Sequence, residues 1–265
     1  MDRRTPMAAG ITFAVLYAIA LLAVPPLPGI DKPGYAIVAH VDDHASAMRA
    51  QALLVAFAAL SLVVVIGYAR QRLTGPPARV FVVGGAAIVV QLVVWTWFTA
   101  GLALHPDQLG SATARTIGDV MAMMWPLRTI TDLMVAVPIL MAANEDRFPR
   151  WMGTAAAVFA VEQLIETITI IGPPGSFISP GGSMNYWLGA PLFVLFFLAL
   201  GVALVPPGTD TGAEDPSPGT DTDDTDSPDT GTSAAEDADD ENATAETDAI
   251  DIPRDDTEEA ASEND

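Results

Sequence analysis

The sequence predicts an all-α, polytopic membrane protein: a bundle of six transmembrane helices followed by a disordered acidic C-terminal tail. Two observations predict this class. Six apolar runs of about 20 residues are each long enough to cross roughly 30 Å of hydrocarbon. The formal net charge of -21 does not contradict them, because the charge is confined to the end of the chain.

The six helices are expected within a transmembrane domain of residues 1–206. Their approximate ranges are 7–24, 47–69, 80–103, 119–143, 151–171 and 186–205. The first run follows Arg3 and Arg4 and has the alternative of being a signal peptide. Its long apolar core runs into Pro25 and Pro26 without a small-residue cleavage site, which favours an uncleaved helix.

The second domain is the acidic tail, residues 207–265. The chain has 33 acidic and 12 basic residues, and 22 acids but only Arg254 lie in this tail, which leaves 11 of each in front of it. The tail has too few large apolar residues to offset the entropy of ordering, so we expect disorder. It either solvates the protein or recruits a basic partner. Its Asp and Thr, together with the scarcity of Lys, suggest a prokaryote.

Orientation follows from the Lys and Arg residues of the connections, which are enriched on the cytoplasmic side. One side receives seven: Arg3, Arg4, Arg70, Arg72, Arg79, Arg147 and Arg150. The other receives three, Lys32, Arg49 and Arg115. This asymmetry predicts a multi-pass protein of the cell membrane with both termini in the cytoplasm.

Four ionisable residues interrupt the apolar runs: Arg128, Asp132, Glu162 and Glu166. A charge at the centre of a membrane helix costs about 2.5–3.5 kcal/mol on the insertion scale, whereas each Leu, Ile, Phe or Val returns about 0.3–0.6. The eight such residues of the run 151–171 that surround the glutamates therefore return about 2.5–5 kcal/mol. Two ionised glutamates cancel that gain, so they must be shielded by neighbouring helices or protonated.

The depths of these residues predict their pairing. Arg128 and Asp132 share one helix face, as do Glu162 and Glu166, because each pair is four residues apart. At 1.5 Å per residue, Arg128 and Glu162 fall at the same level in antiparallel neighbours. We therefore expect a central pair of Arg128 with Glu162, flanked by the other two carboxylates, with one arginine unable to neutralise three acids.

Two further residues complete the candidate binding site. Gln91 falls at a similar depth on the third helix, and Trp125 extends the face of Arg128. Pro126 and Pro138 are expected to bend the fourth helix and free carbonyl groups. An excess of carboxylates at low dielectric is typical of sites for a small solute, a proton or a cation. The alternative is a polar cluster that only holds the bundle together.

The sequence gives little support for catalysis, cofactor binding, nucleic acid binding or a metal site. The sequence lacks the motifs of metalloproteases, serine hydrolases and nucleotide-binding loops, so it predicts no enzyme, although an intramembrane enzyme is not excluded. No cofactor and no nucleic acid partner is expected. His40, His44 and His105 all fall in predicted outer loops, where their spacing only weakly indicates a metal site. The expected partners are the lipid bilayer and a small solute, proton or cation, and the oligomeric state stays open.

Three segments of the later half are distinctive: Arg147-Phe148-Pro149-Arg150-Trp151-Met152-Gly153, Pro106-Asp107-Gln108-Leu109-Gly110-Ser111-Ala112-Thr113 and Leu192-Phe193-Val194-Leu195-Phe196-Phe197-Leu198. Through them the chain resembles a family of uncharacterised prokaryotic multi-spanning membrane proteins of unknown function. The resemblance covers residues 100–205 and leaves the acidic tail outside. It implies a multi-spanning architecture and brings no catalytic residues.

Two functional hypotheses follow. The first is a small transporter-like or solute- or proton-sensing protein that uses the Arg, Asp and Glu cluster. The second is a structural or regulatory membrane protein whose polar cluster stabilises the bundle and whose tail solvates it or recruits a partner.

Overall fold

The computed structural model describes residues 4–205, and these are helical or in short connections, with no strand among them. The predicted disordered tail, residues 207–265, lies outside the described residues. Six helices are long and apolar enough to cross a membrane. The all-α fold with six such helices is therefore confirmed for the part of the chain that the structure describes.

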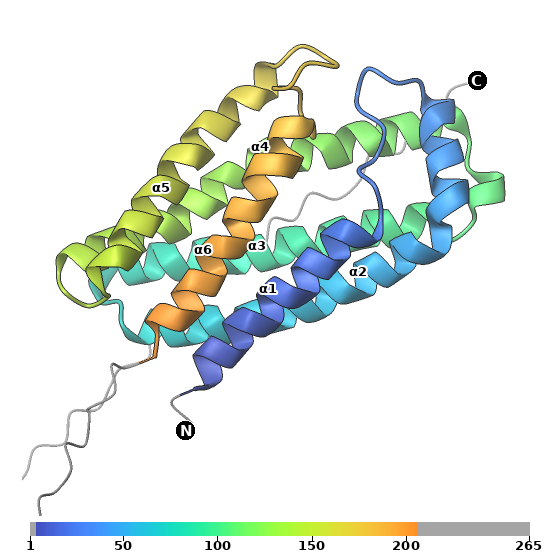
Figure 1. The fold of residues 1–265 in the computed structure, drawn as a ribbon. Coiled ribbons are helices and arrows are strands. Elements are labelled where there is room, and N and C mark those ends of the chain that lie inside the picture. Colours follow the sequence, from blue (N-terminus) through green and yellow to red (C-terminus); the bar gives the residue numbers. More distant parts are fainter. Residues whose placement is uncertain (1–3, 206–265) are drawn as a thin grey trace, which may run out of the picture. The chain divides into compact units, whose positions relative to one another are not determined.

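The helices follow one another with short connections, so that consecutive helices run antiparallel (Figure 1). Their bounds are α1 Thr5–Ala23, α2 Gly34–Gln71, α3 Gly75–Leu102, α4 Ser111–Asn144, α5 Arg150–Glu166 and α6 Ala190–Ala203. Three short segments add a single turn each: the 3-10 turns η1 Pro106–Gln108 and η2 Thr167–Ile171, and the π-helical η3 Asn185–Gly189.

Two helices begin more than a full turn and a half before the apolar runs predict. α2 begins at Gly34, whereas the second run begins at 47, and α4 begins at Ser111, whereas the fourth run begins at 119. The reason is that the added turns are amphipathic. Ile37, Val41 and Met48 are buried along one face of α2, within a second hydrophobic cluster that also receives residues of α3 and α4. A search for uninterrupted apolar runs does not detect such turns.

The main hydrophobic core lies between α1, α2, α6 and the adjoining faces of α3, α4 and α5. Its centre holds stacked and edge-on rings, with Phe13 5.8 Å from Phe193 and 5.7 Å from Phe197 between ring centroids. These contacts fasten α1 to α6. The first apolar run is thus an integral part of the bundle.

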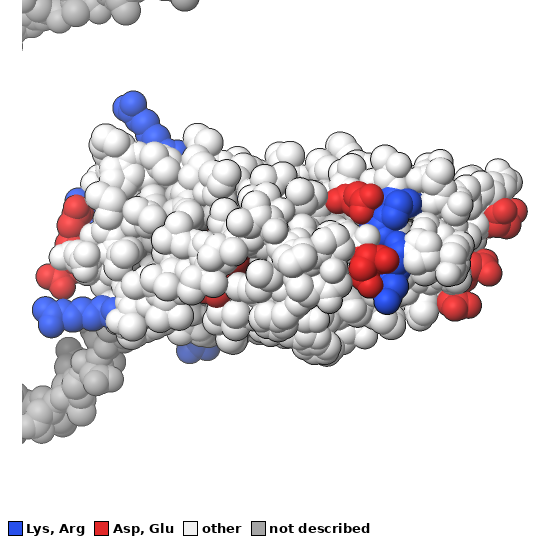
Figure 2. Space-filling model, turned by 90° about the horizontal axis from the view of Figure 1, so that it is seen from above, with Lys and Arg blue, Asp and Glu red and all other residues white. Residues whose placement is uncertain are grey.

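The outer surface of the helices carries many exposed large apolar side chains, as a face in contact with lipid does. On the face seen in Figure 2, charged residues gather toward the two ends, and the long middle is mostly uncharged. At one end Arg72 donates hydrogen bonds to the carbonyl groups of Ala203 and Leu204, at 3.2 and 2.7 Å. A cation there complements the carboxyl end of α6.

The backbones of α1 and α6 touch at two glycines. A Cβ placed on Gly201 would lie 2.9 Å from both Gly10 Cα and the Pro6 carbonyl oxygen. Small residues at such crossings let membrane helices approach closely and gain packing energy. Gly67 on α2, by contrast, has nothing within 4 Å of an added Cβ.

We therefore predict that Gly201→Ala forces α1 and α6 apart and lowers the free energy of unfolding by about 1–3 kcal/mol, the usual cost of overpacking. Gly67→Ala is the matched control and should leave stability unchanged or raise it by up to about 1 kcal/mol. Unfolding midpoints of the purified variants in detergent measure both. Equal stability of the two variants would refute the close α1 to α6 contact.

Candidate functional site

The four ionisable residues singled out in the sequence are all buried inside the bundle. The exposed fractions are 5% for Arg128, 0% for Asp132, 6% for Glu162 and 0% for Glu166. α4 supplies the first two residues and α5 the last two. Their burial excludes the reading of these charges as a solvated face.

The ion pair of Arg128 differs from the predicted one. Arg128 Nε lies 3.0 Å from Asp132 Oδ2, within α4, and the predicted pair with Glu162 is absent from the ion pairs of the described residues. The depth of Arg128 in the membrane does not by itself determine its ion-pair partner, because Asp132 lies one turn away on the same helix face and is also within reach. The guanidinium also lies over two rings, 4.1 Å from the centroid of Phe193 and 5.1 Å from that of Trp125.

The two glutamates form a second group with two amide side chains. Gln163 Nε2 donates to Glu162 Oε2 at 2.7 Å and to Glu166 Oε2 at 3.2 Å. Asn185 Nδ2 donates to Glu166 Oε1 at 2.5 Å. The sequence reasoning missed both amides: Gln163 carries no charge, and Asn185 lies at the end of a predicted loop. The spacing of Gln163 could have been used to predict its contact with Glu166, since it precedes Glu166 by three residues on the same helix.

Irregular helical turns surround Glu166. α5 ends at this residue and continues as the 3-10 turn η2, while Asn185 opens the π-helical turn η3 before α6. Gly189 of η3 leaves the room that the carboxylate occupies, since a Cβ there would lie 2.6 Å from Glu166 Oε1. π-helical turns are rare in proteins, and those that do occur are often found at functional sites.

Several buried polar atoms of the two groups have no hydrogen-bond partner. They are the acceptors Asp132 Oδ1, Glu162 Oε1, Gln163 Oε1 and Asn185 Oδ1, and the donor Arg128 Nη2. A buried polar atom without a partner costs about 1–3 kcal/mol. Four acceptors stand against one donor, so the interior is short of hydrogen-bond donors. Bound protons supply donors of that kind.

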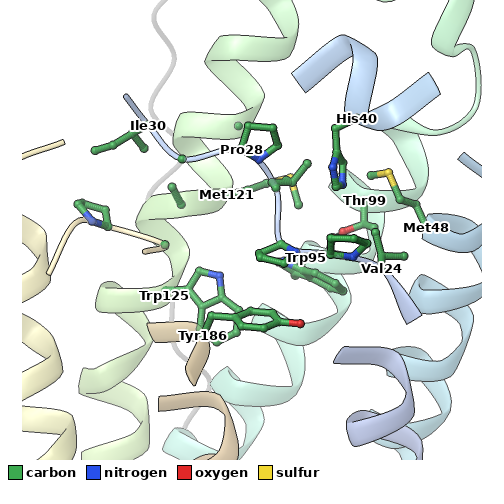
Figure 3. A pocket seen from close by; sticks show the side chains of 18 of the residues that line it. Val24, Pro28, Ile30, His40, Met48, Trp95, Thr99, Met121, Trp125 and Tyr186 are labelled. Atoms are coloured by element: carbon green, nitrogen blue, oxygen red, sulfur yellow. The ribbon is translucent and has the colours of Figure 1, made fainter. Parts of the chain in front are cut away.

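Two adjoining cavities lie near the polar cluster, and one of them is lined by Arg128. The end cavity, of about 80 Å³, is bounded by residues of α1 to α4 and by the connections that follow α1 and α5, with Val24, His40, Met48, Met121 and Tyr186 in its wall. Figure 3 shows Trp95, Trp125 and Tyr186 grouped at one side of this cavity, with His40 and Met48 on another.

The second, inner cavity, of about 30 Å³, reaches Arg128 itself. Its wall also contains Tyr17, Gln91, Leu92 and Met124. Trp95 and Trp125 line both cavities, so the end cavity and the inner cavity adjoin at these two indoles.

Gln91 and Trp125 thus lie beside Arg128 as predicted from depth and helix face, while Tyr17 of α1 was missed. Gln91 Oε1 accepts a hydrogen bond of 3.0 Å from Thr131 Oγ1, which leaves its amide nitrogen as the donor toward the inner cavity. α4 runs on through Pro126 and Pro138. Pro126 cannot donate to the carbonyl of Ala122, a residue of the end cavity wall.

Two of the three histidines are not placed as predicted, whereas His105 lies in the connection between α3 and α4. His40 and His44 lie on α2, not in a loop, with ring centroids 4.6 Å apart and His44 Nδ1 2.9 Å from the carbonyl oxygen of His40. The early start of α2 explains the error. Among residues 4–205, no group of three or more His, Asp or Glu side chains is placed to hold a metal ion.

The described residues therefore define a helical bundle of membrane-spanning length with a charged interior and an internal cavity. Comparison of the chain with protein-family models, curated proteins and solved structures finds no match. What the protein does must be inferred from the site itself.

The Arg128 to Asp132 pair gives a direct test of the site's energetics. Asp132→Asn leaves a buried arginine without its counter-charge, and we expect the free energy of unfolding to fall by about 3–5 kcal/mol. Replacing both residues, as Arg128→Met with Asp132→Leu, should recover most of that loss, because a buried pair is often no more stable than apolar residues of similar volume.

The control pair for this cycle is Arg115 and Asp119, also four residues apart on α4 but with an Asp119 side chain that is half exposed. Its coupling should be about 0.2–1 kcal/mol, as for other exposed pairs. Denaturant unfolding of the single and double variants measures both couplings. A coupling at Arg128 no larger than that at Arg115 would mean that water screens the interior pair.

Proposed function

We propose that the protein is a small integral protein of the cell membrane that binds a solute together with protons, as a transporter or a solute sensor. The observation that carries this proposal is the shortage of donors around Asp132, Glu162 and Glu166, next to a cavity that reaches Arg128. Both termini are proposed to lie in the cytoplasm, on the asymmetry of Lys and Arg.

The energetic cost of the cluster favours this function over a packing role. Buried polar groups that serve packing are normally satisfied, because only a satisfied contact stabilises a bundle. Here four acceptors lack a donor. Protonation of the carboxylates removes charge from the interior and supplies the missing donors. A site of this kind responds to proton binding.

A structural role has one observation in its favour. Two contacts of the cluster join different elements: Thr129 Oγ1 and Thr167 Oγ1 are 2.8 Å apart, and Asn185 binds Glu166. Polar contacts between membrane helices are worth about 0.6–2 kcal/mol each. The second candidate is therefore a cluster that joins α4, α5 and η3 without transporting or sensing a solute.

The double variant Glu162→Gln with Glu166→Gln separates the two candidates. Glutamine keeps the size of the side chain and adds donors, but it cannot exchange a proton. We expect an unfolding midpoint at or above that of the wild type and a loss of proton flux to the level of protein-free liposomes. Proton flux in proteoliposomes under a pH gradient is the measurement.

Glu145→Gln, an exposed glutamate in the connection between α4 and α5, is the matched control and should keep wild-type flux. Wild-type protein without proton flux, or a double variant with full flux, would contradict the transport form of the proposal. A variant that loses its fold would support the structural candidate.

The proposed orientation is testable by labelling, since the chain has no cysteine. Gln108 and Glu145 are exposed at opposite ends of α4. We expect Gln108→Cys to react with a membrane-impermeant maleimide in intact cells, and Glu145→Cys to react only after permeabilisation. The reverse pattern would invert the topology, and labelling of both in intact cells would refute a membrane span between them.

A further inference from the structure

We infer that the solute is a small monocarboxylate with an apolar, flat body. Its carboxylate binds Arg128 in the inner cavity, and its body lies against Trp95 and Trp125 in the end cavity. This inference rests on the proposed function and adds the chemical class of the ligand. It is carried by one unpaired buried donor and by the shape of the space in front of it.

The donor is Arg128 Nη2. Arg128 is 5% exposed, its Nε binds Asp132, and its Nη2 has no partner although the residue lines the inner cavity. Contacts with the rings of Trp125 and Phe193 help to position the guanidinium. A planar guanidinium recognises carboxylates in preference to other groups of the same charge, because its N–H groups match the two oxygens in direction and spacing.

Two neutral side chains can assist Arg128. Gln91 presents its amide nitrogen to the inner cavity, and the Tyr17 side chain lies in its wall beside Arg128. The inner cavity of about 30 Å³ has room for about two water molecules, at about 10–15 Å³ each on the same measure. A carboxylate, with two oxygen atoms, fills a space of this size.

The end cavity accepts the rest of the ligand. Its wall is largely apolar and aromatic, with Val24, Met48, Met121 and Tyr186 around the two indoles. Trp95 and Trp125 line both cavities, so a flat apolar body that lies against them would place its carboxylate at Arg128. His40 is the one titratable imidazole in a wall that is otherwise mostly apolar, which favours a ligand whose single ionised group binds Arg128.

Charge balance links this ligand to protons. The charged or titratable groups around Arg128 are Asp132 on α4, Glu162 and Glu166 on α5 and Tyr17 on α1, while α3 contributes the neutral Gln91 and α6 the ring of Phe193. His40 on α2 lines the end cavity. With all three carboxylates ionised, an anion would enter a site that is already negative. Protonation of the glutamates removes that repulsion, so the carboxylate should bind more tightly as the pH falls.

The test is binding of phenylacetate to the purified full-length protein in lipid nanodiscs, measured by calorimetry. Phenylacetamide, of the same shape without the charge, is the comparison probe. We expect phenylacetate to bind at least about tenfold more tightly than the amide, as a charge-assisted pair at a buried arginine provides. Its affinity should rise about tenfold from about pH 8 to about pH 6, where phenylacetate itself stays ionised.

Variants test whether the preference for phenylacetate over phenylacetamide arises at Arg128 and the two indoles. Arg128→Gln should bind the acid and the amide equally, whereas Arg150→Gln, an exposed arginine at the start of α5, should keep the preference. Trp95→Phe should weaken both probes, and Trp97→Phe, exposed on the same helix, should weaken neither. Where Arg128→Gln does not fold, Gln91→Leu is the second variant and should reduce the preference for the acid.

Equal binding of acid and amide to the wild type, or a preference that survives both Arg128→Gln and Gln91→Leu, would overturn the inference.

Failure of this inference can be distinguished from failure of the proposed function. Proton flux without carboxylate preference would refute the ligand class alone. Phenylacetate binding that depends on Arg128 but does not change between the two pH values, together with absent flux, would refute the link to protons and keep the ligand class.

Discussion

The buried guanidinium of Arg128 is the group on which the interior of this protein depends. Asp132 compensates its charge within one helix, and the rings of Trp125 on α4 and Phe193 on α6 make cation–π contacts with it. Because Arg128 pairs with a residue of its own helix, it forms no ion pair with the glutamates of α5. The Glu162 and Glu166 carboxylates are therefore left to the amides of Gln163 and Asn185, and the interior has more acceptors than donors.

The helix irregularities follow from the same constraint. Glu166 is fully buried, and a regular α5 and α6 would present mainly apolar side chains to it. The 3-10 turn after Glu166 and the π-helical turn at Asn185 bring an amide donor to the carboxylate, and Gly189 makes the space for it. The distorted turns are thus a way to solvate a carboxylate with protein groups where water is scarce.

The sequence predicted the number and type of helices because twenty-residue apolar runs leave few alternatives. It also predicted the burial of Arg128, Asp132, Glu162 and Glu166 from the cost of such residues in lipid. It could not predict the pairing of Arg128, since depth along a helix does not distinguish a neighbour one turn away from one on the next helix. Tyr17, Gln163 and Asn185 were missed because neutral polar residues are common in membrane helices and loops. The early start of α2 was missed because amphipathic turns lack a continuous apolar run.

The proposed site would let ligand binding and proton binding depend on each other without a large motion. Arg128 lines the inner cavity, its Nη2 has no partner, and the charges of the glutamates act on it. An anion bound at Arg128 and a negative charge on the glutamates would repel each other. Each proton that neutralises a carboxylate would therefore strengthen the proposed anion binding, and by linkage a bound anion would strengthen proton binding to the same degree.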